Sequence, residues 1–428
     1  MLLSFRVSNF RSIYETVELS MVAVDIDRPG VREIESISVG ALTTAAIYGA
    51  NASGKSNVVS AIQWLSRAVR RSFEEWEDGG IPRNPFLFAE GPTKSTKFEV
   101  ELSVEGVRYA YELELDSNRV IFESLHSYPL KHKRRIFSRS GDLVAFRRGA
   151  NATARINELL SPRTLVLSAS LKSPNDEIRR FASELVNVVA VGNRRIIPLS
   201  LPHRGSTIDF FDMEVQTRIG LFDDFGPGES WGRDQALALL NFADLGIGNV
   251  VIDRIAVEND GETPLRRRSS RRVRFVHHSN DQEVLFELDQ ESEGTRNWFN
   301  LIGPILSVLK QGGVLLFDEV DASLHTMLTE KVIELFHDPS LNPYGAQLIF
   351  TTHNVSLMDC LNRDEVWITE KRSDGSTDLV AVAEFGGDKV RRSANLSRLY
   401  DSGRLGGVPN FDMSLIYRYL GSPDEVSQ

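Results

Sequence analysis

One short segment carries the residue types that bind the phosphates of a nucleotide. Residues 49–56 read Gly-Ala-Asn-Ala-Ser-Gly-Lys-Ser and match Gly-x-x-x-x-Gly-Lys-Ser/Thr in full. The match follows an apolar strand predicted over 44–48 and opens a helix predicted over 57–70, which is the context of a phosphate-binding loop. In such a loop the backbone N–H groups and the positive helix end face the phosphates. A glycine-rich turn with a chance lysine would not show both flanks.

This loop predicts ATP and Mg²⁺ as ligands. We expect the Lys55 ammonium to neutralise charge on the β- and γ-phosphates and the Ser56 hydroxyl to bind Mg²⁺. The nucleotide-binding residues expected in this segment are Gly49, Asn51, Ser53, Gly54, Lys55, Ser56 and Asn57.

A second segment ends in two carboxylates. Residues 314–319 read Val-Leu-Leu-Phe-Asp-Glu, an apolar strand followed by acids, which is a Walker B pattern. Asp318 is expected to hold Mg²⁺, and Glu319 to act as the general base that polarises the attacking water. A pair of acids after a strand also occurs as a simple helix N-cap, and that alternative applies to Asp318 and Asp321.

A histidine follows the next predicted strand. Residues 347–352 form a second apolar run that ends at His353. In a parallel sheet this position lies beside Glu319, so His353 is expected to act near the γ-phosphate. A lone histidine is more often an ordinary surface or core residue, and only its place in this series favours a functional role.

Hydrophobic periodicity indicates the elements that must position these residues. Period-two alternation runs through the first residues and through 98–125, and it predicts antiparallel strands. Buried strands alternating with helices after 284 predict parallel βαβ units. The fold class is therefore α/β, a P-loop head with a mixed sheet flanked by helices and an antiparallel β-meander. We expect head parts at 1–130 and 281–428, separated by a mainly helical insertion at 131–280 without a long coiled coil.

Composition restricts the class of protein. The chain has 428 residues and a net charge of −10. No apolar run approaches the roughly 18 residues that span a bilayer, and residues 1–10 indicate a strand, not a signal peptide. Cys360 is the single cysteine, which excludes a disulfide framework. A cytoplasmic protein without a membrane contact is expected.

Two basic segments run against the acidic average. Residues Lys131 to Arg148 and Arg266 to Arg274 are rich in lysine and arginine. Local charge of this kind can attract a nucleic acid even when the total charge is negative. A solvated loop explains each segment equally well, so both interpretations stay open. We expect the second segment to lie on a loop that leads toward Ser292.

The motifs together resemble those of RecF/SMC-type ABC ATPases. The resemblance rests on Phe-Arg-Val-Ser-Asn-Phe-Arg-Ser at 5–12, on the loop at 49–57 and on Thr-Thr-His-Asn at 351–354. It implies an ABC/SMC-type head that binds ATP between two heads, each contributing a signature segment. That segment corresponds here to Glu-Ser-Glu-Gly-Thr at 291–295, with Ser292 and Gly294 toward the partner's nucleotide. An ordinary N-cap is the alternative.

A closer resemblance is to prokaryotic AAA-type proteins related to the ATPase part of overcoming-lysogenization-defect (OLD) proteins. It rests on residues 291–295, on Asp-Glu-Val-Asp-Ala-Ser-Leu-His at 318–325 and on the segment 400–409. The resemblance implies that His325 faces a partner head. OLD nucleases continue into a Toprim domain whose acidic set we do not find, so no built-in nuclease is expected. Relatives of this kind act with an effector from a neighbouring gene, often in anti-phage defence.

Two functional hypotheses follow from these motifs. The first is an ATP-driven sensor or scaffold that dimerises through its heads and controls a separate effector. The second is a RecF-like, ATP-dependent DNA-binding repair protein, in which the basic segments contact phosphates. A transporter subunit or a metabolic kinase fits the sequence less well, and no glutamine could be assigned to a Q-loop.

Overall fold

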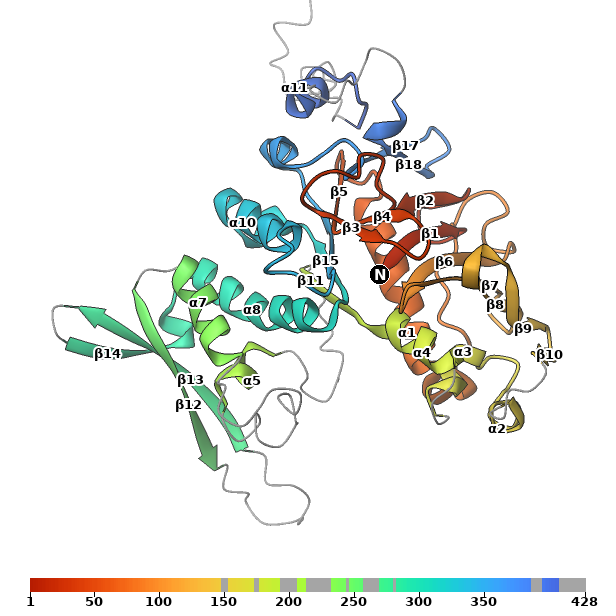
Figure 1. The fold of residues 1–428 in the computed structure, drawn as a ribbon, viewed down its shortest axis with the longest axis horizontal. Helices are drawn as coiled ribbons and strands as arrows, with labels where there is room; N and C mark the ends of the chain where they lie inside the picture. The colour runs from red at the N-terminus through yellow and green to blue at the C-terminus, as the bar shows by residue number, and fades with distance from the viewer. Residues whose placement is uncertain are drawn as a thin grey trace, which may run out of the picture.

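The computed structural model describes residues 1–147, 153–172, 177–192, 206–212, 232–243, 246–256, 269–279, 282–385 and 395–407. Figure 1 shows two large sheets next to each other and a smaller sheet that projects from the remainder of the molecule. The first and last parts of the chain together build the head, since strands from both ends share one sheet.

Seven strands form an antiparallel sheet in the order β10-β9-β8-β7-β6-β1-β2. They are β1 (Leu2–Ser8), β2 (Val17–Ser20), β6 (Thr96–Val104), β7 (Val107–Leu115), β8 (Val120–Ser127), β9 (Arg134–Ser140) and β10 (Leu143–Phe146). In β7, Tyr109, Tyr111 and Leu113 are buried, whereas the residues between them are partly exposed. Alternate side chains point to opposite faces of a strand, so one face of this sheet lies in the core. The predicted meander is confirmed.

Six strands form the central sheet in the order β11-β15-β16-β5-β17-β18. They are β11 (Val188–Gly192), β15 (Val314–Asp318), β16 (Gln347–Thr351), β5 (Thr44–Gly49), β17 (Val366–Lys371) and β18 (Thr377–Ala381). All neighbours are parallel except β17 and β18. Every residue of β5, β15 and β16 is buried, because both faces of a parallel sheet are covered.

Helix α1 (Lys55–Gly79) lies between the two sheets (Figure 1). Its Val58, Ile62, Leu65 and Val69 are buried at the helical spacing predicted from the sequence. One face of the central sheet, including Ile47, packs into the same core as α1 and the antiparallel sheet. The opposite face, including Tyr48, belongs to a second core. The head is therefore layered as sheet, helix, sheet and helices.

Helices from the last third of the chain build the second core. They are α8 (Glu293–Gln311), α9 (Val320–Ser323), α10 (Thr326–His337) and α11 (Leu396–Asp401), with the 3-10 turns η3 (Val355–Cys360) and η4 (Val382–Glu384). Trp298, Phe299 and Ile302 of α8 pack here with Leu315 and Phe317 of β15. The βαβ units predicted for this part are confirmed.

The predicted boundary at residue 130 cuts through the head. Strands β9 and β10 continue the antiparallel sheet, and β11 pairs with β15 in the central sheet. Between them, α2 (Thr153–Glu158), α3 (Val166–Ser170) and α4 (Glu177–Val186) contribute Val166 and Phe181 to the core around α1. Periodicity could not reveal this attachment, since the pairing partners lie far apart in the sequence.

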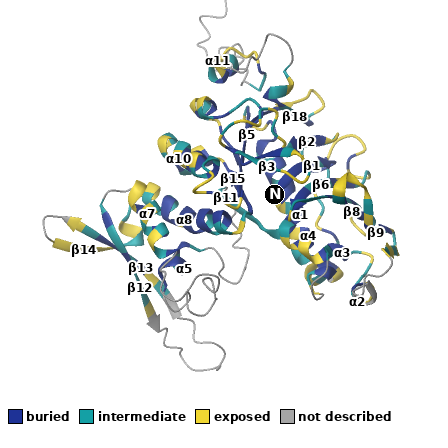
Figure 2. Ribbon diagram, viewed as in Figure 1, coloured by how far each residue is buried: buried dark blue, intermediate teal, exposed yellow. Residues whose placement is uncertain are grey.

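The part of the chain that projects from the head contains both helices and strands, so the prediction of a mainly helical insertion is wrong. It contains α5 (Thr207–Phe211), α7 (Arg233–Ala243), β12 (Ile247–Ala256), β13 (Ser269–Ser279), β14 (Gln282–Glu287) and the turn η2 (Leu288–Gln290). The three strands pair antiparallel in the order β12-β13-β14. Arginine, serine and histidine dominate β13, which hid the strand from an analysis based on apolar alternation. Figure 2 shows that β14, at the sheet edge, is largely exposed.

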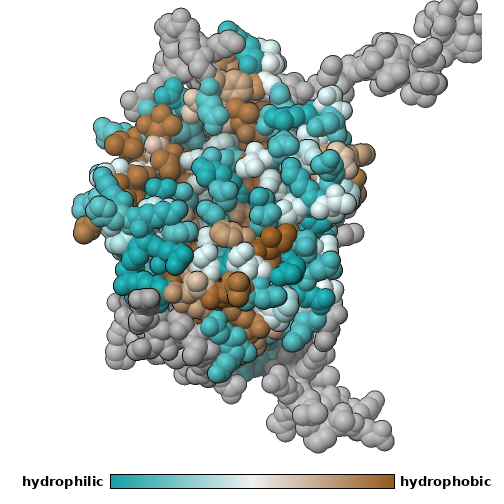
Figure 3. All heavy atoms as spheres, turned by 90° about the vertical axis from the view of Figure 1, so that its right-hand side faces the viewer, coloured by the Kyte–Doolittle hydropathy of each residue, from teal (hydrophilic) through white to brown (hydrophobic). Residues whose placement is uncertain are grey.

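A small hairpin of β3 (Val31–Ile34) and β4 (Val39–Leu42) completes the head. The turn η1 (Pro129–Lys131) joins β8 to β9. On the face shown in Figure 3, apolar side chains form separate patches within a mostly hydrophilic surface. Among the described residues, no helix is long and apolar enough to cross a membrane.

Candidate functional site

The loop at 49–56 has a backbone that requires glycine at two positions. It connects β5 to α1, and Gly49 and Gly54 have φ values of 147° and 111°. A Cβ atom on Gly49 would lie 2.3 Å from Thr369 Oγ1, and one on Gly54 would lie 2.1 Å from Thr377 Oγ1. Any side chain would therefore collide with β17 or β18 in addition to straining the backbone.

Hydroxyl groups from the far end of the chain hold this loop. Ser53 Oγ lies 2.6 Å from Thr369 Oγ1, and Thr377 Oγ1 donates to the Ser53 carbonyl at 2.8 Å. Asn57 Nδ2 donates to Ser12 Oγ at 2.6 Å, so the Asn57 side chain faces the N-terminal segment. Asn51 is exposed. No sequence motif marks Thr369 and Thr377, because both are isolated threonines.

Lys55 folds back onto the loop. Its ammonium donates to the carbonyls of Gly49 and Ala50 at 2.9 and 3.1 Å. Burial lowers the pKa of Lys55, and the carboxylates of Asp321, Glu319 and Asp318 oppose that shift. The acids of the second motif therefore lie within electrostatic range of the loop lysine. Ser56 is partly buried in the first turn of α1.

Asp318 and Glu319 end β15 around one buried threonine. Thr351 Oγ1 donates to Asp318 Oδ1 at 2.7 Å and accepts a hydrogen bond from the Glu319 N–H at 2.7 Å. Glu319 has φ 55° and ψ 58°, a left-handed conformation that is unfavourable for a residue with a side chain. Thr351 fixes this conformation, and it fixes the orientation of the Asp318 carboxylate. Thr351 is a positioning residue that the sequence analysis missed.

The backbone of His353 is anchored to Asp321. Its N–H donates to Asp321 Oδ1 and Oδ2 at 3.3 and 3.4 Å. Although the side chain reaches solvent, partial burial and the nearby Lys55 ammonium lower the pKa of the imidazole, while Asp321 and Glu319 raise it. The imidazole therefore favours the neutral form that can accept a proton.

Strand order brings these groups to one edge. Strand β16 lies between β15 and β5, and the three strands are parallel. Their carboxyl ends therefore meet, which puts the loop at 49–56, the acids at 318–319 and His353 together. Ligands bind at this edge in open α/β sheets.

A family model described as "AAA domain, putative AbiEii toxin, Type IV TA system" matches residues 45–359, well over half of the chain. The chain belongs to this family. The matched region of this AAA-domain chain includes the loop at 49–56, Asp318, Glu319 and His353, which build the edge described above. No curated protein matches the chain.

Several solved structures are similar to this AAA-domain protein. The SMC head bound to the C-winged helix domain of ScpA is 16% identical, with a TM-score of 0.42 and coverage of 89% of this chain and 97% of that chain. The SMC head domain from Thermotoga maritima is 13% identical, with a TM-score of 0.40 and coverage of 89% and 98%. A third is the Smc head domain with an extended coiled coil, bound to the C-terminal domain of ScpA and derived from Pyrococcus furiosus. It is 14% identical, with a TM-score of 0.42 and coverage of 89% and 96%.

The predicted signature segment of this AAA-domain chain caps a helix. Ser292 is the N-cap of α8, and its Oγ accepts a hydrogen bond from the Thr295 N–H at 3.1 Å. Both Ser292 and Gly294 are exposed, and a Cβ on Gly294 would meet only Ser292 Oγ, at 3.8 Å. The geometry is an N-cap that stays open to solvent. A role toward a second head remains a prediction. His325 is the N-cap of α10.

A cavity of about 650 Å³ lies between α8 residues and the edge that carries Glu319. Glu293, Asn297 and Asn300 of α8 line it together with Glu319 and Ser323. Helix α8 thus links the exposed signature segment to the surroundings of the predicted general base.

The described arginines of the second basic segment lie on a strand and have acidic partners. Arg271, Arg272 and Arg274 belong to β13, which corrects the expectation of a loop. Arg271 pairs with Asp209 at 2.6 Å, Arg272 with Glu287 at 2.5 Å and Arg274 with Asp253 at 2.5 Å. Because these arginines are paired with acids, they leave little positive charge free to bind the phosphates of a nucleic acid. Residues 266–268 lie outside the described part.

The first basic segment divides into paired and unpaired charges. Arg139 is buried and donates to the carbonyls of Gly141, Thr164 and Ser161 at 2.8, 2.6 and 2.8 Å. Arg134 pairs with Glu177. These two arginines stabilise the head. Arg148 lies outside the described residues, and the exposed cations near Lys131 are considered below.

Proposed function

We propose that this AAA-domain protein binds ATP with Mg²⁺ at the shared strand edge and hydrolyses it. The observation that carries the proposal is the meeting of the glycine-constrained loop, the Asp318–Glu319 pair and His353 at adjacent parallel strand ends. The residues fit ATP and Mg²⁺. The loop backbone at Gly49 and Gly54 leaves no room for a Cβ atom, and Asp318 supplies a nearly buried carboxylate.

Each residue of the edge has a role in this proposal. Backbone N–H groups of the loop and the Lys55 ammonium bind the phosphates, and Ser56 and Asp318 hold Mg²⁺. The metal neutralises charge on the phosphates when bound. Glu319 orients the attacking water and accepts its proton. His353, neutral at physiological pH, contacts the γ-phosphate side of the site.

Substitution of the loop lysine tests nucleotide binding. We expect Lys55→Ala to abolish ATP binding in calorimetric titrations, because it removes the cation that faces the β- and γ-phosphates. Saturating Mg-ATP, at ~100 times Kd, should stabilise the native protein by about 2.7 kcal/mol and raise its Tm. Lys331→Ala, on an exposed ion pair of α10, is the matched control. Tight ATP binding by Lys55→Ala would refute the assignment.

We further propose that two heads close face to face around ATP, with Ser292 and Gly294 of each contacting the nucleotide of the other. The support is the exposed N-terminus of α8, because the positive end of a helix dipole suits a phosphate. Following the resemblance to the ATPase part of OLD proteins, closure of the heads controls a separate effector. Co-purification with the product of an adjacent gene, with and without ATP, tests that step.

A further inference from the structure

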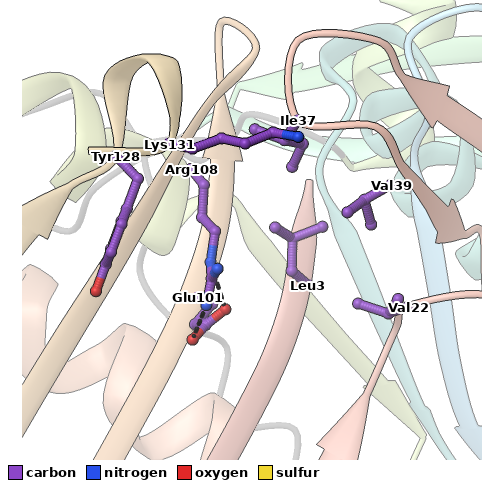
Figure 4. Close-up of a pocket in the computed structure, with 8 residues that line it drawn as sticks. All are labelled: Leu3, Val22, Ile37, Val39, Glu101, Arg108, Tyr128 and Lys131. Carbon is purple, nitrogen blue, oxygen red and sulfur yellow. Dashed lines mark hydrogen bonds and ion pairs between the residues drawn. The ribbon is translucent and has the colours of Figure 1, made fainter. Parts of the chain in front are cut away.

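A second cavity lies between the antiparallel sheet and the β3–β4 hairpin (Figure 4). Its volume is about 450 Å³. The side chains of Leu3, Val22, Ile37 and Val39 form an apolar wall, contributed by β1, the segment after β2 and the β3–β4 hairpin. The sheet contributes charged and aromatic groups on the other side. None of these residues belongs to the strand edge described above.

An irregularity of β1 creates the apolar part. The pairing of β1 with β6 shifts between Leu2, opposite Leu102, and Ser4, opposite Glu101. A bulge of this kind redirects a side chain. Leu3 consequently points to the same face as Glu101, whereas Leu2 lies in the core of the head. An apolar side chain is thus placed on a sheet face that otherwise carries ion pairs such as Arg6 with Glu18.

The polar wall is rigid. Arg108 donates to both carboxylate oxygens of Glu101 at 2.8 and 2.9 Å, and its guanidinium lies over the Tyr128 ring, 5.0 Å from the centroid. A bidentate pair with a stacked guanidinium holds its geometry well. The charge of Arg108 is therefore balanced by Glu101, and its planar guanidinium forms part of the cavity wall.

Three cations without acidic partners among the described residues lie at or after the turn beside the cavity. Lys131 lines the cavity, Lys133 follows on the connection to β9, and Arg135 belongs to β9. All three are exposed, and in the described part of the chain no carboxylate is within ion-pair distance of them. Burial lowers the pKa of His126, and the charges of Lys133 and Arg135 lower it further. The turn that presents them is strained, since Leu130 and Lys131 both have positive φ values, of 51° and 66°. Strained residues that the surroundings maintain cluster at binding sites.

We propose that this cavity docks a short acidic segment of a partner protein that also carries aliphatic side chains. One aliphatic side chain enters the space between Leu3, Val22 and Val39, and carboxylates pair with Lys131 and Lys133. Leu130, which is 90% exposed on the same turn, adds an apolar contact. Charge complementarity selects the acidic partner, and the buried anchor supplies the affinity.

The same features favour a polypeptide over a nucleic acid. A phosphate backbone requires a row of free cations, whereas here Arg108 is already paired with Glu101. An aliphatic wall also offers nothing to a sugar or a phosphate. A second copy of this chain is the alternative occupant, since residues 281–293 carry six acids and no base among aliphatic side chains; sedimentation distinguishes it from a partner protein.

Fluorescence anisotropy with defined probes tests the proposal. The probes are a labelled peptide of alternating leucine and glutamate, its leucine–lysine counterpart and a short DNA duplex. We expect native protein to bind the acidic peptide selectively, and Val22→Glu and Lys131→Glu to weaken that binding by about tenfold or more. Val22 is 39% exposed and Lys131 is exposed, so both variants should fold. Leu143→Glu and Lys331→Glu make the same changes at exposed sites elsewhere and should bind normally.

Three outcomes would overturn the proposal. They are no binding of the acidic peptide at about 1 mM, equal binding by the native protein and both cavity variants, and preferential binding of DNA that Lys131→Glu abolishes. Sedimentation without probes shows whether a second copy occupies the surface instead. ATP titration of the same variants separates this inference from the proposed ATPase function, because the cavity variants should bind ATP normally even if the docking proposal fails.

Discussion

At the scale of single residues, one threonine joins the two acids of the candidate site. Thr351 is fully buried and uses its hydroxyl both as a donor to Asp318 and as an acceptor from the Glu319 backbone. A left-handed glutamate stores strain that its surroundings must compensate. The orientation of the predicted general base therefore depends on a neighbouring strand.

We expect Thr351→Val to reduce ATP turnover more than ATP binding. Valine keeps the shape but leaves Asp318 Oδ1 and the Glu319 N–H without their partner, which should destabilise the fold by ~1–3 kcal/mol. Thr351→Ser keeps the hydroxyl and should restore kcat. Chemical denaturation and phosphate release measure both effects. If Val and Ser variants had equal kcat, the hydroxyl would not position the acids.

The titration of His353 is a second test at this scale. Its pKa should lie below the ordinary value of about 6.5, and Lys55→Ala should raise it by removing a nearby positive charge. Since the folded state has the lowered pKa, the unfolded chain binds the proton more readily. Stability from this group is therefore present above about pH 6.5 and is lost as the pH falls below that value through the lowered pKa of the folded state. NMR of the imidazole protons measures the shift, with Lys331→Ala as the control. An unchanged pKa in Lys55→Ala would show that the two groups do not interact.

At the scale of elements, Ser292 at the N-terminus of α8 has an observed role as a helix cap and a proposed role as a phosphate contact, and the two roles can be tested separately. Ser292 caps the helix in this structure, and in the proposed dimer it faces a phosphate. Ser292→Asp should preserve the cap, because aspartate is a good N-cap, yet its negative charge should oppose ATP-dependent dimerisation.

The measurements for this element are Tm and the ATP-dependent sedimentation coefficient. Ser292→Ala should lose ~1 kcal/mol of stability with the cap, whereas Ser292→Asn should retain the cap without adding charge. If Ser292→Asp dimerised with ATP as the native protein does, the segment would be a helix cap and nothing more.

At the scale of the whole molecule, two sheets and two cores keep the strand edge rigid while the β12–β14 sheet projects from it (Figure 1). Helix α8 packs into the second core and carries the exposed signature segment at its N-terminus. A second head that contacts this segment would therefore act directly on the head that carries the proposed ATP site.

We expect Glu319→Gln to bind ATP, to lower turnover by about 10²-fold or more, and to accumulate as a dimer in ATP. Glutamine keeps the shape of the side chain but cannot accept the proton, so the bridging nucleotide persists. Light scattering coupled to gel filtration measures the dimer, and Glu334→Gln on an exposed ion pair is the control. Normal phosphate release by Glu319→Gln would place the general base elsewhere.

The sequence by itself determined the local parts of this protein. The loop at 49–56, the strands that end at Asp318 and Thr351 and the period-two meander are encoded by neighbouring residues, because glycine conformation and hydrophobic alternation act over a few positions. Only the tertiary structure decided what depends on distant pairing. Thr351 meets Asp318, β11 joins the central sheet, Leu3 reaches a second cavity, and the arginines of β13 find Asp209, Asp253 and Glu287. Side-chain hydrogen bonds and ion pairs across strands leave no periodic trace in the chain, so a sequence pattern cannot predict them.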